Sequence, residues 1–468
     1  MTEAMLEDYQ RFLKKKLDRA KPTGFEKRPE GINPKLFPWQ RDIDSWALKR
    51  GRAALFEDCG LGKTAQQLEW CQSVSDYTGK PTLIVAPLAV ARQTKLEGQK
   101  FGYEVTVCRG QGDVKTGINI CNYEMLDNFQ PEKFAGVALD ESSILKSYTG
   151  TTKRKIVKLF EDTPYKLSCT ATPAPNDLME LLNQGEFLGV MKSNEALSCW
   201  FIADQKNSGR YRLKKHAEKD FWQWVASWAV CIEKPSDIGY SDEGYILPEL
   251  REKSITVPRD RESGTMEALT EKLNMNATGY HREKKRTLEN RCKKAAEIAG
   301  SSGEQFLIWC YQNNEADLLK KLIPEAVEIR GSDKVEKKEQ AAIDFQQGKI
   351  RVLISKPSIF GYGLNFQQCR NMIFCGMDFS FESYYQAVRR IYRFGQKRPV
   401  NIYKIIGENE QVILDTVSRK EQMKLDMGES MAEAMREFQI GEVHGRAFKL
   451  DLGRQRVEFP TWLRSEVG

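Results

Sequence analysis

The chain has 468 residues, of which 40% are hydrophobic and 29% charged, so it is long enough for two packed domains and too apolar to be disordered. Its net charge of +7 permits a polyanionic partner without requiring one. The eleven cysteines include no Cys-x-x-Cys pair and there are three histidines, which excludes zinc-finger and zinc-ribbon spacings.

The sequence contains no basic segment followed by an apolar core at its N-terminus and no run of about 18 apolar residues. We therefore expect neither a signal peptide nor a membrane span. Cysteines such as Cys121 and Cys375 lie within apolar runs, which is typical of buried free thiols in a reducing cytosol.

Short apolar runs rich in Val, Ile and Leu alternate with longer amphipathic segments. These runs are continuous rather than alternating, which predicts strands buried on both faces of a parallel sheet. The expected strands are residues 53–56, 82–86, 118–121, 137–139 and 165–168, and then 306–309, 352–355, 371–375 and 401–405. The predicted fold class is α/β, with two tandem doubly wound modules and helical insertions.

The strand rhythm stops between residues 189 and 250, where tryptophans gather. Trp224 and Trp228 share a helical face, so packing in a core is favoured over a stacking surface for nucleic-acid bases. The predicted organisation is an N-terminal helical extension (1–35), a first module (36–190), a helical extension and linker (191–250), a second module (251–420) that includes a basic helical segment (279–294), and a C-terminal helical tail (421–468).

The segment from Glu57 to Thr64 follows an expected strand and precedes an expected helix, which is the context of a phosphate-binding P-loop. Its Gly60-Leu61-Gly62 backbone would approach phosphate oxygens. Lys63 would reach the β- and γ-phosphates, and the Thr64 hydroxyl would bind magnesium. Glu57 stands where the general pattern has glycine. A chance glycine-rich turn is the alternative.

An acidic pair, Asp140 and Glu141, follows the expected strand 137–139 at the end where ligands bind in parallel sheets. Asp140 would hold magnesium, directly or through water, and Glu141 would orient and activate an attacking water. Solvated loop residues are the alternative for such a pair.

Two further segments fit a nucleotide site. Thr170 and Thr172 end an expected strand and could couple the nucleotide to the partner strand, although an ordinary turn is the alternative. Gln40 carries an amide that could pair with an adenine edge, but on its own a surface glutamine is the favoured interpretation.

The run from Gln386 to Gln396 contains Arg390 and Arg393, three residues apart on a predicted helix. Such arginines project from one face and could reach across a cleft to stabilise charge on a γ-phosphate. A solvated basic face is the alternative, against which the flanking Gln386 and Gly395-Gln396 argue.

Together these motifs resemble superfamily-2 helicases, specifically the Swi/Snf-like branch, over residues 36–406. The resemblance implies two RecA-like domains, with ATP and Mg²⁺ in their cleft and double-stranded DNA along their outer face. It also implies that Gln386 belongs to the nucleotide site, and that Gly363 and Asn365 couple the nucleotide to the nucleic acid.

The chain departs from that pattern in its acidic box, which reads Asp-Glu-Ser-Ser and lacks the histidine that often follows. It also lacks the long insertions of eukaryotic remodelling enzymes. We therefore expect a compact translocase of the bacteriophage or bacterial kind, monomeric and cytoplasmic in a bacterial cell or phage-infected host, with no membrane partner.

Clustered basic residues are the candidates for phosphate contacts with nucleic acid, although a solvated basic helix is the alternative. They are Arg282, Lys284, Lys285, Arg286, Arg92 and Lys95. The leading function is ATP hydrolysis coupled to movement on duplex or branched DNA, which would remodel DNA or its bound proteins. An RNA-unwinding helicase and a nucleotide-gated binding module without turnover are the alternatives. Any replication or recombination partner is unidentified.

Overall fold

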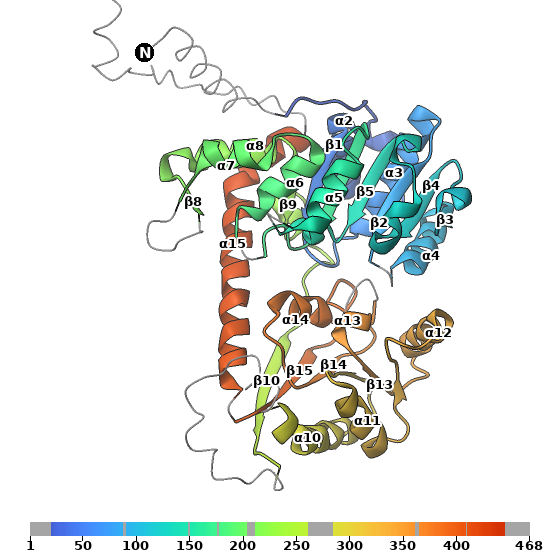
Figure 1. The fold of residues 1–468 in the computed structure, drawn as a ribbon, viewed down its shortest axis with the longest axis vertical. Coiled ribbons are helices and arrows are strands. Elements are labelled where there is room, and N and C mark those ends of the chain that lie inside the picture. The colour runs from blue at the N-terminus through green and yellow to red at the C-terminus, as the bar shows by residue number, and fades with distance from the viewer. Residues whose placement is uncertain are drawn as a thin grey trace, which may run out of the picture.

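The computed structural model describes residues 20–87, 90–147, 150–175, 177–203, 211–260, 284–360, 365–408 and 410–444. Two parallel sheets with helices on both faces form two consecutive modules, one above the other in Figure 1. This arrangement confirms the predicted α/β fold class. Every one of the nine apolar runs expected to be a strand lies in one of the two sheets.

The first sheet has the strand order β3-β4-β2-β5-β6-β1-β9 and all of its pairings are parallel. Its strands are β1 (Arg52–Glu57), β2 (Thr82–Ala86), β3 (Val105–Val107), β4 (Ile118–Asn122), β5 (Gly136–Asp140), β6 (Tyr165–Thr170) and β9 (Ala229–Ile232). The two faces use alternate residues of each strand. In β1, Ala53 and Leu55 belong to one core layer, whereas Ala54 and Phe56 belong to the other.

The helices of the first module divide between these two layers. On the Leu55 side lie α2 (Pro38–Arg50), α3 (Lys63–Thr78) and α4 (Ala91–Phe101). On the Phe56 side lie α5 (Thr151–Leu159), α6 (Glu180–Leu188), α7 (Ser193–Trp200) and α8 (Glu218–Ala226). Because both faces are covered, the central strands β1, β2, β4, β5 and β6 are almost entirely buried, as their continuous apolar character predicts, whereas Val107 of the edge strand β3 is exposed.

The second sheet has the order β10-β15-β14-β11-β13-β12 and is likewise parallel. Its strands are β10 (Leu250–Val257), β11 (Phe306–Trp309), β12 (Val327–Glu328), β13 (Val352–Ser355), β14 (Asn371–Cys375) and β15 (Val400–Gly407). Helices α10 (Leu288–Gly300) and α11 (Asn313–Leu322) cover one face. Helices α12 (Val335–Gln346), α13 (Pro357–Phe360) and α14 (Phe381–Val388) cover the other.

The segment predicted to be a helical extension and linker, 191–250, contains more than helices. Strand β9 pairs with β1 and completes the first sheet, so the first module extends beyond residue 190. Strands β7 (Phe201–Ala203) and β8 (Tyr211–Leu213) form a separate antiparallel pair. The tryptophans pack in the core as predicted, since the rings of Trp224 and Trp228 lie 5.2 Å apart and both are buried.

One long helix, α15 (Gln411–Val443), connects the two modules and runs vertically from the second module up to the first in Figure 1. Near its start, Ile413 and Val417 pack in the core of the second module. Near its end, Met431 and Met435 pack in the core of the first module. The predicted tail therefore begins ten residues earlier than expected and is an integral part of both cores.

The remaining predictions concern the N-terminus, the cysteines and membrane spans. The described part of the predicted N-terminal extension, from residue 20, contains a short 3-10 turn at Pro29–Gly31. All eleven cysteines are free and ten are buried, whereas Cys59 is partly exposed. Among the described residues, no helix combines the length and the apolar character that crossing a bilayer demands.

Candidate active site

The P-loop joins β1 to α3 and contains two glycines in left-handed conformations. Gly60 has φ 98° and Gly62 has φ 85°, backbone angles that residues other than glycine rarely adopt. A Cβ atom on Gly62 would lie 2.5 Å from Gln40 Nε2, and one on Gly60 would lie 3.0 Å from the backbone nitrogen of Phe394. The backbone of Gly60 therefore lies directly against the second module.

Gly60→Ala should lower protein stability by about 1–3 kcal/mol and also weaken ATP hydrolysis, because the added Cβ combines a strained φ with crowding against the second module. Gly79→Ala is the matched control, since Gly79 has φ 69° at the end of α3 and a Cβ there would meet nothing within 4 Å. Thermal unfolding and steady-state ATPase assays of both variants provide the measurement. Equal loss of ATPase activity in both would contradict the role assigned to the close approach.

Lys63 begins α3 and folds back over the loop. Its Nζ donates to the carbonyl oxygens of Glu57 at 2.6 Å and Asp58 at 3.1 Å. Burial works to lower the pKa of Lys63, but the surrounding acidic groups, Cys59 first and then Glu141, outweigh it and raise that pKa. The ammonium group is therefore charged at the point where a phosphate-binding lysine is expected.

Glu57 stands where the general P-loop pattern has glycine, and its buried position explains how the larger side chain fits. Its side chain is fully buried beneath the loop, where Gln66 Nε2 donates to Glu57 Oε2 at 2.7 Å. Burial raises the pKa of Glu57 to about 7. The larger side chain is accommodated because it points into the module and leaves the backbone of the loop free to bind phosphate.

The acidic pair lies at the carboxyl end of β5, as predicted. Gln67 Nε2 donates to Asp140 Oδ1 at 2.8 Å, and the Tyr123 hydroxyl donates to the Asp140 carbonyl at 2.7 Å. Glu141 has φ 52°, and among the described residues it is the single non-glycine residue with a positive φ. Such strain persists where the surrounding structure enforces it, often at functional sites.

The two carboxyl groups hold protons unusually well. Burial first, and then the neighbouring Asp140, raise the pKa of Glu141 to about 7 against the opposing charges of Lys63 and Arg390. Burial likewise raises the pKa of Asp140, against the hydrogen bond from Gln67. A carboxyl group with a pKa near the working pH is well suited to accept a proton from water.

The arginine motif of the second module faces this acidic pair. Gln386 Nε2 lies 3.4 Å from Glu141 Oε2, at hydrogen-bonding distance. The Arg390 guanidinium donates to the carbonyl of Gln386 at 2.9 Å and to its Oε1 at 3.0 Å. Gln386 therefore connects Arg390 of one module with Glu141 of the other, and Arg390 is 4% exposed.

Arg393 lies close enough to Arg390 for the two positive charges to interact. Burial first, and then the charge of Arg390, lower the pKa of Arg393 to about 10, so the group remains protonated at neutral pH. An anion placed beside the two guanidinium groups would relieve their repulsion, which fits a γ-phosphate. Gln396, which ends the motif, instead holds the loop before β14 by donating to the Gln367 carbonyl at 2.8 Å.

Gln40 is buried rather than exposed, so the alternative of a surface glutamine is wrong. Its Nε2 donates to the Leu61 carbonyl at 2.7 Å, and its Oε1 accepts from the Phe37 backbone at 2.9 Å. Both ends of the amide thus contact the protein and brace the P-loop. Recognition of adenine by Gln40 stays a prediction and would require one of these bonds to be exchanged.

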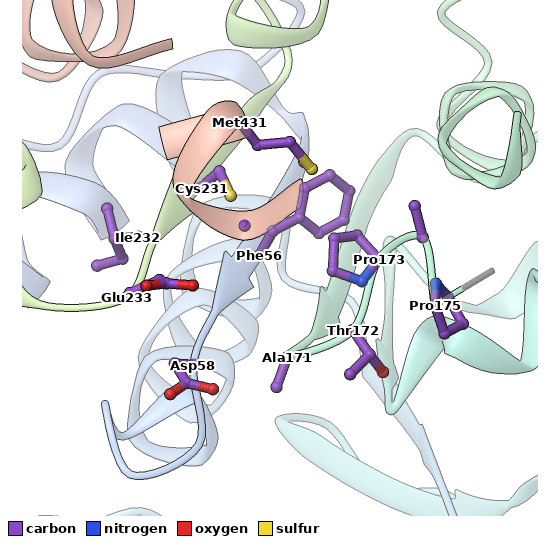
Figure 2. A pocket seen from close by; sticks show the side chains of 12 residues that line it. Phe56, Asp58, Ala171, Thr172, Pro173, Pro175, Cys231, Ile232, Glu233 and Met431 are labelled. Atoms are coloured by element: carbon purple, nitrogen blue, oxygen red, sulfur yellow. The ribbon is translucent and has the colours of Figure 1, made fainter. Parts of the chain in front are cut away.

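The threonine turn after β6 lies beside the P-loop. Thr170 Oγ1 accepts from the Thr172 backbone at 3.1 Å, and both residues are buried. Thr172 and Asp58 both line a cavity of about 40 Å³, and in Figure 2 Ala171 lies between them and Met431 of α15 lies on the opposite side. That volume holds a few water molecules and no nucleotide.

The predicted coupling residues of the second module are described in part. Asn365 Oδ1 accepts from the Gln367 backbone at 3.1 Å, and the Asn365 carbonyl accepts from Gln346 at 2.7 Å. These bonds fix the turn that precedes the arginine motif. Gly363 lies outside the described residues.

One of the predicted nucleic-acid contacts is corrected by the structure. Lys284 is 3% exposed and its ammonium lies 4.4 Å from the centre of the Tyr311 ring, so it supports the second module from within. Of the other basic residues, Lys285 and Lys95 are exposed and Arg286 is half-buried. Arg92 is exposed and forms an ion pair with Glu339 of the second module. Arg282 lies outside the described residues.

The predicted magnesium ligands, Thr64 and Asp140, offer oxygen donors, which Mg²⁺ prefers. Among the described residues, no group of three His, Cys, Asp or Glu side chains could hold a metal ion. A magnesium ion here would therefore share phosphate oxygens with these two residues, as is usual for this ion. When bound, it would neutralise part of the phosphate charge.

Part of the chain is similar to known helicases. Residues 284–395 match the family model "Helicase conserved C-terminal domain". Protein p41 of Acyrthosiphon pisum secondary endosymbiont phage 1 is 24% identical over 85% of this chain and 98% of its own length.

Two vertebrate proteins are also similar. The DNA annealing helicase and endonuclease ZRANB3 of Bos taurus is 28% identical over 34% of this chain and 16% of its own length. The SWI/SNF-related matrix-associated actin-dependent regulator of chromatin subfamily A-like protein 1 of Xenopus tropicalis is 23% identical over 81% of this chain and 43% of its own length. The chain thus spans less than half of either protein. The family match and these relatives together confirm the predicted resemblance to Swi/Snf-like superfamily-2 helicases.

Proposed function

We propose that the protein couples Mg-ATP hydrolysis to movement on duplex or branched DNA. The observation that carries this proposal is the meeting of Glu141 from the first module with Gln386 and Arg390 from the second. Among the described residues, the first module supplies Lys63 and Glu141 and the second supplies Arg390, so in this proposal hydrolysis depends on how the two modules are placed relative to each other. That dependence is what a motor needs to convert a chemical step into movement.

The residues divide the chemistry as follows. Lys63 binds the β- and γ-phosphates, and Glu141 accepts a proton from the attacking water and orients it. Arg390 and Arg393 stabilise the negative charge that develops on the transferred phosphoryl group. Since ATP binds both modules at once, it favours their closed arrangement, and release of the products allows them to separate.

DNA is the proposed track of the protein. The relatives include a DNA annealing helicase, and the exposed Lys95 and Lys285 leave basic positions on both modules. We further propose that the protein acts as a monomer in the cytoplasm of a bacterial cell or phage-infected host. The Arg-Phe-Gly-Gln ending of the arginine motif favours DNA over RNA.

Steady-state ATP hydrolysis should be stimulated strongly by duplex or branched DNA and weakly by RNA. The assay compares protein alone with protein plus single-stranded DNA, duplex DNA, branched DNA or RNA at a fixed salt concentration, because phosphate contacts are salt-dependent. Lys63→Ala, which removes the phosphate-binding ammonium, should abolish turnover in every condition.

Stimulation by RNA alone would replace this proposal with an RNA helicase. Nucleotide binding without turnover in any condition would instead favour a nucleotide-gated binding module. Movement along duplex is measured separately by displacement of a third strand.

A further inference from the structure

One face of α14 contacts the first module through three polar side chains. Glu382, Tyr385 and Arg389 are spaced three and four residues apart, so they project from the same side of the helix. Each of them reaches one of the two loops that carry the proposed catalytic groups. Arg390, the next residue in the chain, faces the acidic pair instead.

Asp58 receives two of these contacts. It lies in the P-loop, between Glu57 and Gly60, and Arg389 donates to its Oδ2 at 2.7 Å. The Tyr385 hydroxyl donates to its other carboxylate oxygen, Oδ1. The side chains of Asp58 and Arg389 are each 16% exposed, so the ion pair is largely shielded from solvent. Shielded pairs are costly to break, because each partner leaves a buried charge behind.

Glu382 makes the equivalent contact with the other catalytic loop. It accepts from Ser143 Oγ at 3.0 Å and forms an ion pair with Lys146. Ser143 and Lys146 belong to the turn that directly follows Glu141. The helix that carries the arginine motif is thereby fixed both to the P-loop and to the acidic loop.

We propose that Asp58 is a positioning residue that holds Arg389 and Tyr385, and so sets Arg390 and Arg393 in register with the P-loop. This inference rests on the proposed function, in which those two arginines act on the γ-phosphate. Arg389 itself touches no reacting atom in this scheme. It acts through the adjacent Arg390. When the contact with Asp58 holds the backbone at Arg389, it also sets the direction in which the Arg390 side chain projects.

Cys59 offers a native reporter of the contact. It is the residue next to Asp58, its Sγ lies 3.9 Å from Gln386 Oε1 of the second module, and the other ten cysteines are buried. Separation of α14 from the P-loop would expose this thiol. Its alkylation by iodoacetamide in nucleotide-free protein, followed by peptide mass spectrometry, therefore measures opening of the interface without any ATPase assay.

Arg389→Ala and Asp58→Ala should each accelerate Cys59 alkylation about tenfold, and the double variant should be no faster than either single variant, because contacting residues are not additive. Tyr385→Phe should have a smaller effect in the same direction. Arg330→Ala is the control, since Arg330 forms ion pairs with Asp317 and Glu328 inside the second module. Additive acceleration in the double variant, or none in the singles, would overturn the inference.

The catalytic readout separates positioning from general damage. Arg389→Ala should lower kcat roughly 10- to 100-fold with KM for ATP little changed, as expected for a misplaced catalytic group. Arg389→Lys, which retains the charge, should recover part of the loss. Faster alkylation with unchanged kcat would overturn the positioning role. If wild-type protein shows no turnover while alkylation follows the pattern above, the contact stands and the proposed function fails.

Discussion

Arg390→Ala should lower kcat for ATP hydrolysis by roughly 10³- to 10⁵-fold, the range for removal of an arginine that stabilises phosphoryl transfer. Arg390 is buried and bonded to Gln386, which in turn lies against Glu141, so its charge is held at the interface where negative charge would develop. The measurement is steady-state hydrolysis at saturating ATP in the presence of stimulating DNA.

The control for this variant is Arg398→Ala. Arg398 lies in the same module, is about half exposed, and donates to the Gln368 carbonyl at 2.8 Å, so its loss should change kcat little. Arg390→Lys keeps the charge but not the planar fork, and should recover a minor part of the activity. A kcat for Arg390→Ala within tenfold of wild type, in protein with a normal unfolding temperature, would contradict the assigned role.

Glu141→Gln should lower kcat by roughly 10²- to 10⁴-fold while ATP still binds, because the amide preserves the shape of the carboxylate but cannot accept a proton. The positive φ of Glu141 indicates that the surrounding structure holds this half-buried residue in place, as is common at functional sites. ATP affinity is measured in parallel with a fluorescent analogue. Loss of binding together with loss of turnover would indicate collapse of the site rather than loss of a base.

The same residue predicts the pH dependence of the wild-type enzyme. Since burial raises the pKa of Glu141 to about 7, the carboxylate form is present above that pH and is lost as the pH falls through it. We expect kcat/KM for ATP to fall about tenfold per pH unit below pH 7, because this parameter reports the pKa of the group in the free enzyme. The residual activity of Glu141→Gln should lack this decline.

Glu57 must be distinguished from Glu141, because burial also raises its pKa to about 7. Its side chain points away from the proposed phosphate site toward Gln66. Glu57→Gln should therefore retain the acidic decline of kcat/KM. If that variant lost the decline and Glu141→Gln kept it, the general base would be misassigned.

Much of the fold could be predicted because buried parallel strands leave a strong local signal. Runs such as Phe306–Trp309 and Asn371–Cys375 are apolar at consecutive positions, and both form strands with the predicted bounds. The P-loop and the acidic pair were also predictable, since each lies directly after such a strand. Their chemistry depends on residues that are close together in the sequence.

Features that depend on distant residues could not be predicted. Strand β9 has four residues and follows the tryptophan-rich helix α8 directly, so its local pattern does not separate it from a helical extension. The basic segment suggested that Lys284 faces solvent, but Tyr311, which covers its ammonium group, is far away in the sequence. The partnership of Asp58 with Arg389 likewise joins residues 331 positions apart.

Helix α15 also determines the order in which the protein can be completed during synthesis. Its 33 residues span about 50 Å at 1.5 Å per residue, and its far end supplies Met431 and Met435 to the core of the first module. Gln439 then bonds to both backbone groups of Cys231 in β9. The first module, although translated first, therefore acquires its full core after the second module has been made. Until then, its core layer on the Phe56 side stays open to chaperones or to aggregation.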